Sequence, residues 1–217
     1  RSEQAHRVIH SNNRELGMFK QVSKTMLGGA VALGMFGALG SANAAVDTYV
    51  IDPSHTFPSF EADHMGGLSL WRGQFEKTKG MVTLDRANKT GTVDIEIDAA
   101  SLDFGHGKMN EHAKDVDMFD VEAHPTITYK ASKMRFEGDK PVEVLGDLTL
   151  KGITKPVPLK INTFKCIMHP MKKAEVCGAD AVAEFKRTDF DLGYAVDRGF
   201  FPEVKVLITI EAVKQPK

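Results

Sequence analysis

The sequence predicts an all-β protein made of antiparallel hairpins, closed as a barrel or stacked as a sandwich. Three observations predict it. Hydrophobic residues recur with a period of two from about residue 45 onward, turn residues separate the periodic runs, and the runs follow one another every ten to fifteen residues or so. An α-helical period is confined to one short stretch.

Three runs show the alternation most clearly. "TVDIEID" places Val93, Ile95 and Ile97 on one face, and "PVPLKINTF" and "EVKVLITIEAV" alternate in the same way. Weaker runs bring the expected number of strands to about eight. The expected strands are 48–63, 74–85, 91–100, 126–136, 141–151, 156–165, 179–188 and 203–213. The turn signals "RANKTG", "EGDKP" and "KGITKP" lie between several of them.

One stretch, Gly105 to Pro125, lacks the alternation and includes a helix-compatible piece around residues 108–115. Between two strands this indicates a long connection with a helical turn, of the kind that caps the mouth of a barrel.

The N-terminus is predicted to be separate from the fold. Residues 18–44 have Lys20 and Lys24, an apolar run over 26–39 and the small-x-small sequence Ala42-Asn43-Ala44, which together are typical of a secretory signal peptide. A membrane anchor is the alternative, but the run is shorter than the roughly 20 residues that a spanning helix needs. We therefore expect an upstream extension (1–17), a signal peptide (18–44), a mature domain (45–217) and a periplasmic product without a membrane span.

Composition argues against binding by charge. The formal net charge is −1, the hydrophobic fraction is 42%, and no block of Lys and Arg occurs. Neither nucleic acid nor an anionic membrane surface is indicated as an electrostatic partner.

Candidate catalytic residues are few and poorly arranged. His64 follows Glu61 and Asp63 and is a possible acid/base group, and His106 and His112 lie six residues apart in the long connection. No H-E-x-x-H, G-x-S-x-G or phosphate-binding glycine motif occurs. The competing interpretation of His64 is a hydrogen-bonded residue at a strand end.

Apolar side chains gather where exposed loops are expected. The chain has 10 Met and 13 Phe, and several of the Met fall in or near loops. Core packing is the default for each one, but together with about eight strands they make an interior that holds one long apolar molecule plausible.

Both cysteines lie in "KCIMHPMKKAEVCGAD", residues 165–180. In an exported chain two cysteines between successive strands favour a disulfide, Cys166 to Cys177. One alternative is zinc bound by Cys166, His169 and Cys177, but such a site would lack a fourth ligand. Another is copper(I) bound by Met168, His169 and Met171. A redox role of the two cysteines is a third.

Three segments resemble the YceI family. "YVIDPSHTFPSFEADHMG" is similar to its Y-x-I-D-x-x-H-S-x-x-x-F-x-x-x-H-x-G pattern with Thr56 in place of Ser, "GDLTLKGITKPVPL" to its G-x-L-T-x-x-G-x-T-x-P-V, and "KRTDFDLGY" to its R-S/T-x-F/W-G with Asp191 in place of Gly. The cysteine segment resembles a Gram-negative subset that includes a Neisseria protein that binds an isoprenoid quinone.

The resemblance implies a lipocalin-like eight-stranded antiparallel β-barrel with a short helix in a mouth loop. It implies a bound isoprenoid, ubiquinone above all, or another long amphiphilic lipid such as a polyprenyl phosphate or a fatty amide, with no catalysis and no other cofactor. A homodimer is a further expectation. We expect an entrance and an interior formed by apolar side chains. The entrance residues are Met65, Leu68, Trp71, Met109, Met118 and Phe119, and the interior residues are Phe60, Phe75, Tyr129 and Phe185.

The leading hypothesis is a periplasmic lipid-binding protein that carries, stores or senses an isoprenoid. An exported enzyme using His64 or the pair His106 and His112 is one alternative. A metal-binding or stress-response module centred on His169 is another.

Overall fold

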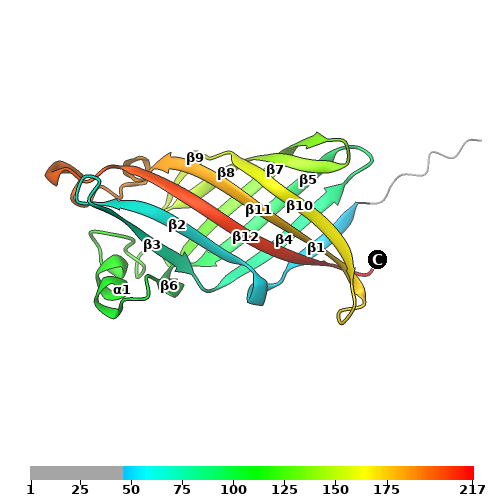
Figure 1. The fold of residues 1–217 in the computed structure, drawn as a ribbon, viewed down its shortest axis with the longest axis horizontal. Helices are drawn as coiled ribbons and strands as arrows, with labels where there is room; N and C mark the ends of the chain where they lie inside the picture. The colour runs from blue at the N-terminus through cyan, green and yellow to red at the C-terminus, as the bar shows by residue number, and fades with distance from the viewer. Residues whose placement is uncertain (1–45) are drawn as a thin grey trace, which may run out of the picture. The chain divides into compact units, whose positions relative to one another are not determined.

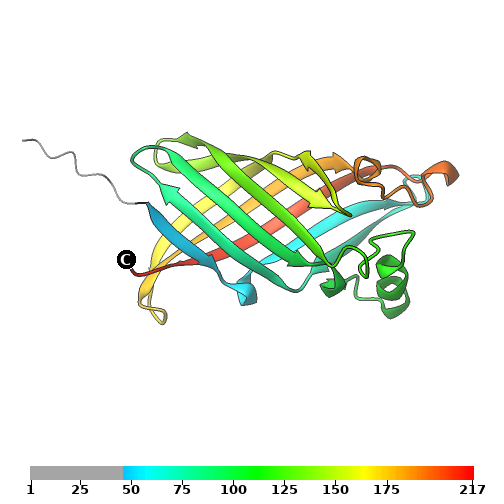
Figure 2. The same ribbon diagram turned by 180° about the vertical axis from the view of Figure 1, so that it is seen from behind.

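The computed structural model describes residues 46–217, which form one closed antiparallel barrel of eight strands (Figures 1 and 2). The predicted fold class is confirmed. The predicted extension and signal peptide lie outside the described residues.

Within residues 46–217, twelve strand segments build the eight barrel strands, because some strands are interrupted. The segments are β1 (Asp47–Ile51), β2 (Phe57–His64), β3 (Ser69–Phe75), β4 (Thr78–Asp85), β5 (Thr90–Asp98), β6 (Leu102–Asp103), β7 (Thr126–Glu137), β8 (Lys140–Leu150), β9 (Ile153–Pro156), β10 (Leu159–His169), β11 (Ala174–Lys186) and β12 (Glu203–Lys214).

The barrel closes through β12, which pairs with two successive segments of the same long strand. Its first half pairs with β2, from Val204 opposite Ala62, and its last residues pair with β1, ending with Lys214 opposite Tyr49. β3 and β4 follow the same division, because β3 pairs with β2 and β4 with β1. The order around the barrel is β1/β2, β3/β4, β5, β7, β8, β9/β10, β11 and β12.

The break between β1 and β2 is a short 3₁₀ turn, Pro53–His55. Pro53 has no N–H to give to a ladder, and the Asp52 carboxylate accepts from the backbone N–H (3.1 Å) and hydroxyl (2.6 Å) of Ser54. Asp52 also forms an ion pair with Lys172 on the β10–β11 hairpin. Lys172 and Ser54 hold the pKa of Asp52 well below its usual range. The ion pair between Asp52 and Lys172 therefore links this break to the β10–β11 hairpin.

The alternating runs turn their apolar faces inward. Val93, Ile95 and Ile97 face the interior from β5, and the alternate residues Val204 to Ile210 face it from β12. Three strand limits differ most from expectation: the second strand begins at Ser69 rather than 74, β10 ends at His169 rather than 165, and β11 begins at Ala174 rather than 179. The apolar segment around Trp71, which we expected in a loop, is paired with β2 instead.

The long connection contains α1 (Gly107–Lys114), as predicted, and β6 directly precedes it. The Asn110 side chain accepts from the Phe104 N–H (2.7 Å) and donates to Asp103 (2.6 Å), so the first turn of α1 is fastened to β6. Figures 1 and 2 show α1 at the barrel end where β2 meets β3 and where β11 continues into the 187–202 loop. No helix in the described residues is long and apolar enough to span a membrane.

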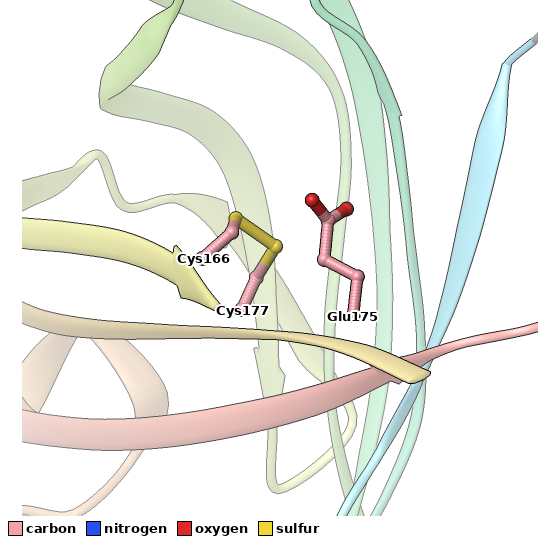
Figure 3. A group of neighbouring side chains, drawn as sticks. All are labelled: Cys166, Glu175 and Cys177. Carbon is pink, nitrogen blue, oxygen red and sulfur yellow. A yellow bond between two sulfur atoms is a disulfide. The ribbon is translucent and has the colours of Figure 1, made fainter. Parts of the chain in front are cut away.

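The opposite end of the barrel carries the disulfide (Figure 3). Cys166 and Cys177 face each other in the β10–β11 ladder, with Cα atoms 4.0 Å apart, so the predicted disulfide hairpin is confirmed. The strands run past the cysteines to a tight turn, whereas we had expected the cysteines in the connecting loop. Because both sulfurs are bonded to each other, they cannot serve as thiolate ligands, and the zinc hypothesis is wrong.

A polar cluster lies against the disulfide. Arg86, from the β4–β5 turn, places Nη2 3.1 Å from the Cys166 sulfur, 2.8 Å from the Tyr49 hydroxyl and 3.1 Å from Glu175 Oε1. The Tyr49 hydroxyl donates to the same carboxylate oxygen at 2.5 Å. Burial and the neighbouring Glu175 carboxylate raise the pKa of Tyr49, which stays a neutral donor. We call Arg86, Tyr49 and Glu175 the polar plug, because they close this end of the interior.

Replacing both cysteines, Cys166→Ala with Cys177→Ala, should lower the free energy of unfolding by about 3 kcal/mol, since the closed loop is short. Urea unfolding followed by Trp71 fluorescence measures it. Reductant should destabilise the wild type by a similar amount and leave the double variant unchanged. Equal stability of the two proteins without reductant would contradict a structural role for the disulfide.

Candidate functional site

The barrel interior is hollow in two adjoining compartments. The outer compartment, of about 340 Å³, lies toward α1, and the inner one, of about 180 Å³, lies toward the disulfide. Four residues line both compartments, so the two lie next to each other: Pro58, Ile97, Leu148 and Val206.

Aromatic rings form one wall of the outer compartment. Phe60 on β2 lies 5.5 Å from Phe104, 6.0 Å from Phe75 and 6.2 Å from Phe119, measured between ring centroids. Gly73 makes room for this cluster, because a Cβ there would lie 2.7 Å from the Phe60 ring. Trp71 joins the cluster through Phe104 at 6.0 Å. These rings bury a large apolar area and hold the wall in a fixed shape.

The polar side chains of the outer compartment lie on the elements at the mouth. The His64 ring packs between Trp71 (5.1 Å) and Phe200 (5.5 Å), and the His112 ring of α1 meets Tyr194 at 4.8 Å. Contact between α1 and the 187–202 loop therefore narrows the opening.

Arg187 adds a partly buried positive charge to the mouth. Its Nη1 donates to the backbone carbonyls of Leu192 (2.6 Å) and Tyr194 (2.9 Å), which fixes the guanidinium at the start of the loop. Burial lowers the pKa of Arg187, and the nearby Asp63 carboxylate partly offsets this. The remaining N–H groups of Arg187 are available to an acceptor in the cavity.

The inner compartment is almost entirely apolar. Tyr129 closes part of its wall and donates its hydroxyl to the Val157 carbonyl at 2.9 Å, so its polar atom is satisfied by the barrel. Gly146 allows the ring to lie there, because a Cβ at this position would be 2.6 Å from Tyr129 Cζ. Burial raises the pKa of Tyr129. Such a compartment favours hydrocarbon over any polar group.

The structure brings together most of the predicted ligand-binding residues. Those that line the outer compartment are Phe60, Trp71, Phe75, Met109, Met118, Phe119 and Phe185. Tyr129 lines the inner one. Met65 and Leu68 line neither and are 59% and 72% exposed on the β2–β3 turn. Sequence reasoning missed Phe104, Arg187, Tyr194 and Phe200, which come from irregular segments.

The predicted His64–carboxylate pair is not formed among the described residues. Glu61 pairs with Arg72 (2.7 Å), and the Asp63 carboxylate accepts from the backbone N–H groups of Gly66 (2.8 Å), Gly67 (2.6 Å) and Phe201 (2.9 Å). Of the histidines in the long connection, His112 lines the cavity, whereas His106 is exposed and caps α1 by accepting from the Met109 N–H at 3.2 Å.

His169 serves the turn of the β10–β11 hairpin. Its Nδ1 accepts from the backbone N–H of Met171 (3.3 Å) and of Lys172 (3.2 Å). Within residues 46–217 it belongs to no group of three His, Cys, Asp or Glu side chains placed to share a metal ion, and copper(I) on Met168, His169 and Met171 stays a prediction. The hypothesis of a metal module at His169 gains no support from this geometry.

A closed antiparallel barrel with an apolar interior and a polar mouth defines the class of lipocalin-like lipid-binding barrels. A family model described as a YceI-like domain matches residues 49–212. Protein YceI of Escherichia coli O157:H7 is 33% identical over 203 residues, and the match covers 89% of this chain and 100% of the relative. A UPF0312 protein of Ectopseudomonas mendocina is 30% identical over 195 residues, and the match covers 88% of this chain and 100% of the relative. The chain belongs to the YceI family.

Solved structures share the fold. BcnA of Burkholderia cenocepacia has a TM-score of 0.61 at 24% identity, covering 74% of this chain and 98% of that one. A polyisoprenoid binding domain from Saccharophagus degradans has a TM-score of 0.57 at 15% identity, covering 77% and 98%. At these identities the likeness establishes the architecture of the barrel.

Replacing Asp63 with Ala should release the β2–β3 turn from the 187–202 loop, because one carboxylate holds three N–H groups of the two segments. Hydrogen exchange of the Gly66, Gly67 and Phe201 amides should accelerate, while the amides of the β11–β12 ladder stay protected. Unchanged exchange at Phe201 would show that the loop is held by other contacts.

Acid should act on the wild type in the same way. Partial burial alone would raise the pKa of Asp63, but the N–H donors of Phe201, Gly67 and Gly66 outweigh it and hold the pKa below 3.8. The stabilisation is therefore complete above about pH 4 and is lost as the pH falls through the folded-state pKa. If these amides of the wild type stayed protected at a pH well below the folded-state pKa of Asp63, the assignment would be contradicted.

Proposed function

We propose that this chain is a periplasmic protein that holds a long isoprenoid lipid, of the ubiquinone or polyprenyl type, in the two compartments of the barrel. The observation that carries the proposal is the pair of adjoining cavities, of which the inner one is apolar and the outer one carries polar side chains at the mouth. The isoprenoid chain would lie inward and the head group at the mouth.

The free energy of binding would come from removing the chain from water. Each buried CH₂ contributes roughly 0.8 kcal/mol, and an isoprene unit has five carbons, so a few units offset the cost of ordering the ligand. The polyisoprenoid-binding description of the Saccharophagus domain supports the same class of ligand.

The mouth favours a neutral head group with acceptor oxygens. Among the described residues that line the cavity, Arg187 is the one permanently charged cation, and two of its hydrogen bonds already go to the backbone. A phosphate at this depth would need more compensation than Arg187 supplies, especially beside Asp63. The carbonyl oxygens of a quinone need only donors, which Arg187, His64 and His112 can provide.

The proposed periplasmic location is supported by the predicted signal peptide at 18–44 and by the disulfide, because disulfides persist in oxidising compartments. A role in carriage or storage fits a ligand buried along the whole barrel. Sensing would in addition need a change that a partner can detect.

Val206→Phe should weaken binding of ubiquinone at least tenfold, because Val206 lies where the compartments join and a larger ring would block the passage. The matched control is Leu207→Phe, one residue along β12 on the opposite face. Quenching of Trp71, the single tryptophan, measures binding at the mouth. Equal affinity of both variants and the wild type would place the ligand elsewhere.

A further inference from the structure

Four large apolar side chains are exposed around the mouth. Met65, Leu68 and Leu70 on the β2–β3 hairpin are 59%, 72% and 53% exposed, and Phe201, at the end of the 187–202 loop, is 51% exposed. We call these four residues the apolar rim. Segments 65–71 and 199–202, which carry them, contain no charged residue. Contiguous apolar surface of this kind marks an interaction site rather than ordinary exposure.

The two segments of the apolar rim are held together as one surface. Asp63 binds both through the backbone N–H groups of the β2–β3 turn and of Phe201. The Phe201 ring lies 3.5 Å from the Cβ position of Gly67, and a Cβ on Gly66 would meet the Gly199 carbonyl oxygen at 2.9 Å. The Asp63 carboxylate at this junction accepts from three backbone donors, and the charged residues that flank the two segments, Arg72 and Arg198, each lie near a carboxylate, Glu61 at 2.7 Å and Asp197 at 3.9 Å.

The apolar rim is continuous with the cavity. Along the same segments, His64, Trp71 and Phe200 line the outer compartment, and they alternate in sequence with the exposed Met65, Leu70 and Phe201. Figures 1 and 2 show both segments at the barrel end that carries α1. A molecule that leaves the outer compartment past these residues meets the apolar rim next.

We propose that the apolar rim docks on a lipid bilayer and places the mouth of the barrel at its surface. The inference rests on the proposed function, since a long isoprenoid is dissolved in a bilayer before the protein takes it up. Passing such a chain through water is unfavourable for every carbon exposed. A rim inserted among the lipid head groups lets the chain move from one apolar phase to the other, by the shallow insertion that interfacial proteins use.

The opposite end of the barrel provides a comparison. Met168 and Met171 on the β10–β11 hairpin are also exposed, at 71% and 84%, but they flank the disulfide and the polar plug rather than an opening. If exposed apolar area alone caused docking, both ends would bind. If docking depends on the apolar rim, only the mouth end of the barrel should bind the bilayer.

The test uses the protein as the cell produces it, purified without detergent and with its N-terminus identified by mass spectrometry. Flotation with vesicles of phosphatidylethanolamine and phosphatidylglycerol (3:1), free of isoprenoid, measures docking without ligand. Leu70→Ser with Phe201→Ser should lower the partition coefficient about tenfold or more, from the loss of two half-buried apolar side chains. Met168→Ser with Met171→Ser should match the wild type. Both variants should keep the thermal transition of the wild type.

Salt separates the apolar mechanism from an electrostatic one. Because the four rim side chains carry no charge, flotation of the wild type should change less than twofold between 0.1 and 0.5 M NaCl, over which the Debye length falls by roughly half. Loss of docking in salt, equal docking of the two double variants, or no docking by the wild type would overturn the proposal. So would a dimer that Leu70→Ser with Phe201→Ser dissociates, because a second copy would then cover the rim.

Failure of docking and failure of lipid binding remain distinguishable. Vesicle flotation is measured without isoprenoid, whereas ubiquinone binding is measured by Trp71 quenching without vesicles. If docking is correct, Leu70→Ser with Phe201→Ser should also slow ubiquinone transfer from vesicles to the barrel about tenfold, and the Met168 and Met171 variant should not. Transfer at the wild-type rate by both would overturn the role of the rim in uptake.

Discussion

Closure of the barrel by β12 is the constraint on which the rest depends. β12 pairs with β2 along its first half and with β1 along its last residues. This pairing removes both sheet edges and encloses a space of fixed circumference. Aromatic rings fill one side of this space, and small or β-branched residues such as Val206 leave the centre open. Because the inward face of each strand is apolar, the enclosed space suits hydrocarbon and excludes water.

The two ends of the barrel are built differently, and this gives the cavity a direction. At one end Arg86, Tyr49 and Glu175 bond to one another beside the disulfide; the Arg86 Nε is buried without a partner among the described residues, but Arg86 and Glu175 line neither compartment. At the other end Arg187 keeps free N–H groups, and the histidine rings lie between aromatic neighbours. An amphiphile therefore fits with its polar end at the mouth.

The strands could be predicted because their side chains repeat every two residues; the alternation separates two faces of each strand, and the structure shows that the apolar faces of β5 and β12 point inward. The segments without a period could not. Arg187, Tyr194 and Phe200 reach the cavity from a loop whose path depends on contacts with α1, and no local pattern reports those contacts. Met65 and Leu68 were expected at the entrance for their hydrophobicity, but the Gly66-Gly67 turn directs them to solvent. The segment around Trp71 belongs to β3, because Trp71 pairs with Ala62 across the β2–β3 turn.

The central claim is that the barrel holds an isoprenoid in the cell, and native mass spectrometry of protein purified from the periplasm without detergent tests it most directly. The account predicts a complex whose extra mass dissociates on activation and appears in the organic extract as an isoprenoid with a neutral head group, such as ubiquinone. A protein recovered empty under these conditions, or one that releases a small polar metabolite, would contradict it.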